Sequence, residues 1–227
     1  MKIPNNFSVN RARLAQRKIS KLVVRRDVLP SKISVVGGVD VTYLHDLAIG
    51  TIVCLRFRDM KLIDRAFSIV KVRFPYVPTL LAFREIAPVV AAYKLLKIKP
   101  DVILVDGQGL IHPYRAGFAC HLGVVLRKPT IGVAKKLLCG HILTWRENIA
   151  YIEDRAEIIG VALKLKSSWK PIYISIGNMV SLDTAIRIVR RTIIHGKLPE
   201  PIRVAHNLAN DIRRELSEEF KDFLNNL

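Results

Sequence analysis

The sequence is short of cysteine and of long apolar runs, and each shortage excludes a class of protein. The only cysteines are Cys54, Cys120 and Cys139, and their spacing forms no pairs. This excludes a disulfide scaffold or a zinc finger and favours reduced thiols in a cytoplasmic protein. No uninterrupted apolar run approaches the roughly 20 residues that a membrane span needs. We therefore expect no membrane-spanning helix.

Acidic residues are also scarce. The chain has 19 Asp and Glu against 37 Lys and Arg, a formal net charge of +18, and no acid stands between Asp106 and Glu147. Such an excess of positive charge destabilises a folded protein through repulsion between the charges, and it attracts polyanions. Half of the 227 residues are hydrophobic, which excludes intrinsic disorder. We expect a basic face, with nucleic acid as the first candidate partner and an anionic membrane surface as the second.

Hydrophobic periodicity predicts a single α/β domain over residues 1–227. Three successive alternating or Val-rich segments predict an antiparallel meander, and later short apolar segments predict parallel strands buried on both faces. The predicted strands are 33–43, 47–57, 62–74, 102–105, 130–134, 158–164 and 172–176. The predicted helices are 9–24, 79–97, 116–126, 182–194 and 202–224, with Pro88 dividing the second into two and Ser181 capping the fourth.

Two acidic residues stand in apolar surroundings. Asp40 lies inside the Val-rich segment 35–41, and Asp106 follows the apolar segment 102–105. A carboxylate inside a strand needs a partner, and ligands of open sheets bind beyond the carboxyl ends of parallel strands. Asp106 also precedes a glycine, so a turn formed by its own side chain explains it equally well. If the two strands are neighbours, the two carboxylates approach one another.

Glu85, in the segment Ala82-Phe83-Arg84-Glu85, is a candidate third carboxylate. Like charges in a poorly solvated site raise each other's pKa unless a cation lies between them. Ion pairs with the abundant Lys and Arg are the rival explanation, whereas a third acid favours a divalent ion. Hard oxygen ligands suit Mg²⁺ or Mn²⁺ better than zinc. A carboxylate-bound Mg²⁺ in a basic protein indicates phosphodiester chemistry.

Gly107, His112 and Lys135 extend this candidate site. Gly107 permits close approach to the backbone. His112 lies in a loop bounded by glycine and proline, which favours a functional role over a purely structural hydrogen bond. Lys135 ends the next apolar strand, at the same sheet edge as Asp106, where a lysine can stabilise phosphate charge. Without Asp106, a solvated surface lysine would be the better interpretation.

Two prolines, Pro75 and Pro78, enclose Tyr76 and Val77. Because proline fixes φ, they predict a stiff loop that presents the tyrosine. Proteins that open nucleic acid insert rigid side chains into the base stack. The alternative is a tyrosine buried in a tight connection, which composition alone slightly favours.

In their order and spacing, these motifs resemble the endonuclease V family, the deoxyinosine-directed repair nucleases. The matching blocks are Gly38-Val39-Asp40, Pro75-Tyr76-Val77-Pro78 with Leu81-Ala82-Phe83-Arg84-Glu85, Val105-Asp106-Gly107-Gln108-Gly109 with His112-Pro113, Gly132-Val133-Ala134-Lys135, and Leu198-Pro199-Glu200-Pro201. The resemblance implies a ribonuclease H-like fold, an α/β mixed sheet with three antiparallel strands and then parallel strands, flanked by helices.

The resemblance also implies a role for each candidate residue. Asp40, Glu85 and Asp106 match the metal-site carboxylates, which would bind Mg²⁺, or alternatively Mn²⁺. His112 and Lys135 match polar residues close to the scissile phosphate. The strand-separating wedge is matched by Pro75, Tyr76, Val77 and Pro78, and the pocket for the extruded base is matched by Gly107. Supporting positions are matched by Arg84, Arg115 and His206, the last in some members only.

Three positions depart from the family pattern. Thr79 stands where a glycine often follows the wedge, Tyr114 stands in the first of two positions that are often both arginine, and Asn178 replaces a histidine. We expect Thr79 to stiffen the loop or to crowd the base pocket. None of the three touches the carboxylates, so an active enzyme is expected.

The function implied by the resemblance is a DNA repair endonuclease. It would nick DNA at the second phosphodiester on the 3′ side of deoxyinosine and leave 3′-hydroxyl and 5′-phosphate ends. We expect a cytoplasmic monomer whose partner is deoxyinosine-containing DNA, with no membrane partner. One alternative is a nuclease of the same fold that acts on inosine-containing RNA, and another is a non-catalytic nucleic-acid-binding module. The three carboxylates argue against the module, because they repel phosphate.

Overall fold

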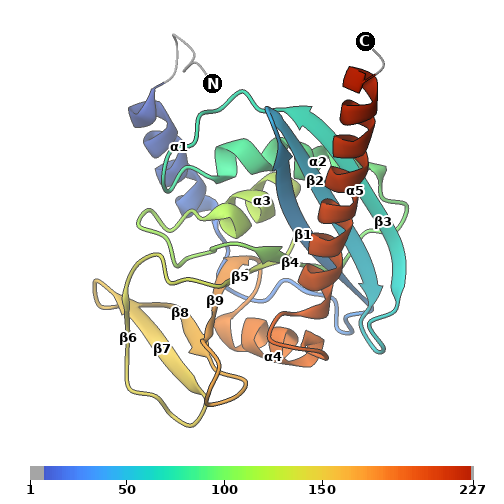
Figure 1. The fold of residues 1–227 in the computed structure, drawn as a ribbon. Coiled ribbons are helices and arrows are strands. Elements are labelled where there is room, and N and C mark those ends of the chain that lie inside the picture. The colour runs from blue at the N-terminus through green and yellow to red at the C-terminus, as the bar shows by residue number, and fades with distance from the viewer. Residues whose placement is uncertain (1–7, 226–227) are drawn as a thin grey trace.

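The computed structural model describes residues 8–225, and their strands form one mixed sheet (Figure 1). The strands are β1 (Val35–Leu44), β2 (Leu47–Arg56), β3 (Leu62–Lys71), β4 (Val102–Asp106), β5 (Thr130–Ala134), β6 (His141–Ile142), β7 (Ile149–Asp154), β8 (Glu157–Leu163) and β9 (Ile172–Asn178). Their order across the sheet is β3-β2-β1-β4-β5-β9-β8-β7-β6. The single-domain prediction covers 1–227, of which 1–7 and 226–227 lie outside the described residues.

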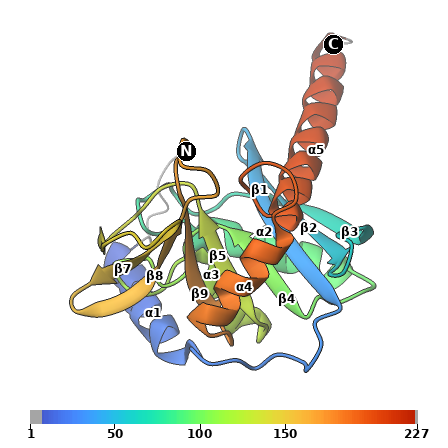
Figure 2. The same ribbon diagram turned by 90° about the horizontal axis from the view of Figure 1, so that it is seen from below.

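Helices cover both faces of this sheet. They are α1 (Val9–Leu22), α2 (Ala82–Leu95), α3 (Phe118–Leu126), α4 (Leu182–Thr192) and α5 (Glu200–Asn225). One apolar core lies between the sheet and α2 and α3, and a larger core includes residues of α4 and α5. The far end of α5 extends past the sheet (Figure 2). No helix within residues 8–225 is long and apolar enough to cross a bilayer.

The strand pairing confirms the mixed sheet that the sequence predicts. β1, β2 and β3 form the antiparallel meander, and β4 pairs in parallel with both β1 and β5. The expectation that the later strands continue in parallel is wrong, because β9 is antiparallel to β5 and to β8, and β8 is antiparallel to β7. No crossover helix lies between β5 and β9, so the chain returns through hairpins instead of the crossover that parallel pairing requires.

β6 and β7 are not among the predicted strands. The turn between β7 and β8 has left-handed φ angles at both Arg155 and Ala156, the conformation of a type I′ hairpin. Because neither residue type signals a left-handed turn, the sequence does not reveal this hairpin.

Pro88 does not divide α2, so the prediction of two helices is wrong. The helix is continuous from Ala82 to Leu95 with Pro88 inside it. Pro88 packs against Gly50 of β2, where a Cβ atom would come within 2.6 Å of the Pro88 carbonyl carbon. Ser68 of β3 also donates a 2.7 Å hydrogen bond to the Pro88 carbonyl oxygen. We attribute the continuity of the helix to this packing on the sheet, which outweighs the local cost of the proline.

Candidate active site

The three candidate carboxylates approach one another where β1, β4 and α2 meet. β1 and β4 pair in parallel with Val39 opposite Val105, so the next residues, Asp40 and Asp106, lie side by side. Glu85 is buried in the first turn of α2, and it is close enough to both aspartates for their charges to raise its pKa. The condition stated for the sequence, that the two strands are neighbours, is therefore met, and the approach of the two aspartates follows from it.

Each carboxylate has its own protein partner. Lys135 Nζ lies 2.8 Å from Asp106 Oδ2, and the Tyr43 hydroxyl donates to Glu85 Oε1 over 3.1 Å. His206, on α5, places its Nδ1 2.8 Å from Asp40 Oδ2. Tyr43 was not a predicted site residue, because a side chain that supports a carboxylate leaves no motif of its own.

Burial and the charges of neighbouring carboxylates act on two of these acids, Asp40 and Glu85. Burial is the largest cause that raises the pKa of Asp40, and the charge of Asp106 raises it further. The hydrogen bond from His206 acts in the opposite direction and lowers this pKa. Burial also raises the pKa of Glu85 to about 8, with the charges of Asp40 and Asp106 acting in the same direction. The protein therefore supplies less positive charge to these two carboxyls than their ionised forms need.

That charge deficit matches the chemistry of a hard cation. Among residues 8–219, whose side chains the structure describes, no three His, Cys, Asp or Glu side chains lie in an arrangement that could hold a metal ion as they stand. The three acids nevertheless form an all-oxygen donor set, and a divalent cation favours their ionised forms. The residues present thus fit Mg²⁺ or Mn²⁺ in donor type and charge.

A pocket of about 520 Å³ adjoins the carboxylates. The residues that line it include Asp106, Gly107 and Lys135 and, from the β3–α2 connection, Tyr76 and Thr79. Gly132 lets the loop after β4 lie directly on β5, because a Cβ there would come within 2.4 Å of the Gly109 amide nitrogen. The pocket is large enough for a small planar ligand.

The loop that joins β3 to α2, residues 72–81, carries the Pro75-Tyr76-Val77-Pro78 motif. The Tyr76 side chain is exposed, with a relative accessibility of 70%. The alternative of a buried tyrosine is therefore wrong. Arg84, at the start of α2, places its guanidinium 4.8 Å from the Tyr43 ring centre and 5.9 Å from that of Tyr76.

His112 faces the β3–α2 loop. It is buried, and the backbone N–H of Tyr114 donates to its Nδ1 over 3.2 Å. The remaining nitrogen, Nε2, therefore carries the proton and donates to the Thr79 carbonyl oxygen over 2.9 Å. Both ring nitrogens are thus engaged by the protein, so this structure gives His112 a structural partner on each side. Its predicted role near a phosphate stays a prediction.

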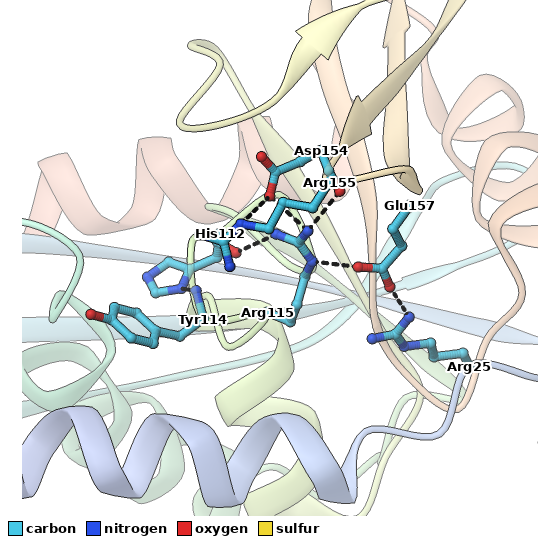
Figure 3. Close-up of polar contacts among 7 residues, drawn as sticks. All are labelled: Arg25, His112, Tyr114, Arg115, Asp154, Arg155 and Glu157. Atoms are coloured by element: carbon cyan, nitrogen blue, oxygen red, sulfur yellow. Dashed lines mark hydrogen bonds and ion pairs between the residues drawn. The ribbon is translucent and has the colours of Figure 1, made fainter.

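Arg115 holds the turn that follows His112. Its backbone is in the left-handed region, with φ of 51°, and its guanidinium donates to the His112 carbonyl oxygen over 3.1 Å. The guanidinium also lies 2.7 Å from carboxylate oxygens of both Asp154, the last residue of β7, and Glu157, the first residue of β8 (Figure 3). Glu157 in turn contacts Arg25, which follows α1. Arg115 is therefore a structural link between three segments that are distant in sequence.

A buried histidine on α3 predicts a pH dependence of stability. Burial lowers the pKa of His121 to about 4, and its Nδ1 has no hydrogen-bond partner. Unfolded histidine titrates near pH 6.5, so between these values the unfolded chain binds more protons and stability is lost as the pH falls. We expect His121→Leu to lose less stability than the parent from pH 7 to pH 4, by up to about 3 kcal/mol.

Denaturant unfolding of both proteins at several pH values in this range measures the difference. The variant removes the unpartnered ring nitrogen of His121, so the comparison at pH 7 reports the effect of exchanging a neutral imidazole for an apolar side chain. Parallel pH profiles for the parent and His121→Leu would contradict the assignment of a neutral, buried histidine.

Comparison with known proteins gives one consistent family. The family model for endonuclease V matches residues 17–207. Endonuclease V of Thermofilum pendens is 48% identical over 223 residues, which cover 98% of this chain and 96% of the relative. The crystal structure of endonuclease V from Streptomyces avermitilis superimposes with a TM-score of 0.86 at 34% identity, covering 95% of this chain and 98% of that one.

A further solved relative contains nucleic acid. Endonuclease V of Ciona intestinalis, as a D234N variant, was crystallised with a 23mer DNA that contains an inosine followed by a ribo-adenosine. It is 31% identical to this chain, with a TM-score of 0.83, and the match covers 92% of this chain and 98% of that one.

Proposed function

Because this chain belongs to the endonuclease V family, a family of nucleases, we propose that it is a DNA repair endonuclease directed to deoxyinosine. It nicks the strand at the second phosphodiester on the 3′ side of the lesion and leaves 3′-hydroxyl and 5′-phosphate ends. The observation that carries the proposal is the meeting of Asp40, Glu85 and Asp106 next to a pocket of about 520 Å³.

Asp40, Glu85 and Asp106 would hold the divalent ion, for which we propose Mg²⁺. Such an ion, when bound, lowers the pKa of a coordinated water and polarises the phosphodiester. Tyr43 and His206 orient Glu85 and Asp40 through their hydrogen bonds. Lys135 places a positive charge at the pocket wall, 2.8 Å from Asp106, where it stabilises the charge of the phosphate.

The pocket takes the extruded base. Deamination turns the 6-amino group of adenine into a carbonyl, which exchanges a hydrogen-bond donor for an acceptor. A pocket that donates a hydrogen bond to the carbonyl of hypoxanthine therefore rejects the amino group of adenine. The Gly107 amide already donates to the Val133 carbonyl oxygen over 3.0 Å. Because this N–H is already engaged, we expect Gly107 to help the base by leaving space at the pocket wall rather than by donating a hydrogen bond to it. Mispaired lesions also flip out at a lower cost than paired bases.

The test is cleavage of matched duplexes that contain either deoxyinosine or adenine at one position. We expect a single nick, 3′ to the lesion, only in the inosine strand and only when Mg²⁺ is present, with loss of activity on chelation. Mn²⁺ in place of Mg²⁺ tests the alternative ion. Equal cleavage of the adenine duplex, or cleavage in the presence of a chelator, would refute the proposal.

An RNA strand of the same sequence with inosine at the same position tests the alternative substrate. Faster cleavage of the RNA would assign the chain to inosine-containing RNA. Tight binding of both strands without cleavage of either, at any divalent ion concentration, would favour a non-catalytic module.

A further inference from the structure

Thr79 in the β3–α2 loop is held by hydrogen bonds from two other parts of the chain. Gln16, fully buried on α1, donates through Nε2 to the Thr79 carbonyl oxygen over 2.5 Å, and His112 donates to the same oxygen over 2.9 Å. The Thr79 hydroxyl accepts from the Arg13 guanidinium and donates to the Pro78 carbonyl oxygen. One residue therefore anchors this loop to α1 and to the loop after β4.

The conformation of Thr79 makes this anchor necessary. Its φ of 70° lies in the left-handed region, which a β-branched residue occupies only when its surroundings impose it. A glycine adopts that conformation freely but has no hydroxyl for Arg13 to contact. The threonine side chain thus supplies the hydroxyl that Arg13 contacts, and the same side chain makes the left-handed backbone at this position strained.

Arg13 also contacts a residue of the loop after β4, Tyr114. Its guanidinium lies 4.7 Å from the centre of the Tyr114 ring, and that of Arg17 lies 5.7 Å from the same centre. Tyr114 is next but one to His112, which lines the pocket. Thr79 and Tyr114 are thus joined through one arginine of α1.

We infer that α1 acts as a clasp on the β3–α2 loop, with Arg13 as a positioning residue that acts through Thr79. Thr79 lies three residues after Tyr76, and both line the same pocket. The clasp fixes the direction in which Tyr76 projects and the shape of the adjoining pocket wall. This role rests on the proposed action on a deoxyinosine duplex. Arg13 itself touches none of the three carboxylates.

The test uses Arg13→Ala, with Arg11→Ala as the matched control. Arg11 is exposed on the same helix, so its loss removes the same charge without the Thr79 contact. We expect Arg13→Ala to raise KM for a deoxyinosine duplex about tenfold over Arg11→Ala, with kcat within about twofold, because the charged hydrogen bond to Thr79 is lost. A single-stranded substrate should show a smaller rise, because it needs no strand separation.

Two further variants test the route through Thr79. Thr79→Val removes the hydroxyl and keeps the branched shape, so it should raise KM like Arg13→Ala, and the double variant should be no worse than either single one. Thr79→Ser keeps the hydroxyl and should retain the parental KM. Additive effects of Arg13→Ala and Thr79→Val would overturn the clasp.

A readout that needs no substrate separates this inference from the proposed function. In Arg13→Ala, amide hydrogen exchange in residues 76–81 should become faster than in the parent and in Arg11→Ala, while exchange in β4 and β5 stays unchanged. Unchanged exchange in residues 76–81 would overturn the clasp whatever the activity. If exchange rises but the parent cleaves no inosine substrate, the clasp stands and the proposed function fails.

Discussion

Asp40→Asn and Asp106→Asn are each expected to reduce cleavage of a deoxyinosine duplex at least about a thousandfold, with DNA binding still measurable. Asparagine keeps the shape of the side chain but removes the charge that would hold a divalent ion. Binding persists because the variant presents less negative charge to phosphate. Folding should persist as well, since burial and the charge of Asp106 already raise the pKa of Asp40 and make its ionised form costly.

Single-turnover cleavage and a binding titration on the same duplex measure the two effects separately. Asp211→Asn is the matched control, because it removes an equal charge from an exposed carboxylate on α5 that pairs with Arg214. This control should cleave at the parental rate. Near-normal, Mg²⁺-dependent turnover by Asp40→Asn or Asp106→Asn would show that the active site lies elsewhere.

Tyr76→Ala is expected to weaken binding to a deoxyinosine duplex by about one to two powers of ten, since stacking of an aromatic ring on a base contributes roughly 1–3 kcal/mol. The side chain is 70% exposed, so truncation removes little packing from the folded protein. We propose that the ring fills the gap that the extruded base leaves. Saturating enzyme should recover much of the cleavage rate, because the carboxylates are untouched.

Tyr76→Phe is the control, because the ring rather than the hydroxyl stacks, and it should bind nearly like the parent. Titrations on duplex and single-stranded substrates of one sequence measure the effect, and the single strand should lose less. Equal affinity of Tyr76→Ala and the parent for the duplex would reduce Tyr76 to an exposed loop residue without a role in strand separation.

Local sequence patterns predict the elements that carry the candidate carboxylates. The apolar segments around Asp40 and before Asp106 form β1 and β4, and Ser181 caps α4 through its side chain as expected. These features are predictable because alternation, apolar runs and caps are local consequences of residue type. Pro88 shows the limit, because its contacts with Gly50 and Ser68 lie on other elements.

By itself, the sequence determined the basic charge, the mixed α/β architecture, the family motifs and the residue types of the candidate site. Only the tertiary structure decided how these residues are held. Tyr43 donates a hydrogen bond to Glu85, both ring nitrogens of His112 are hydrogen-bonded within the protein, and Arg13 donates a hydrogen bond to Thr79. Such contacts join positions as far as 66 residues apart. Their geometry depends on the packing of whole elements against one another, which no local pattern of residues encodes.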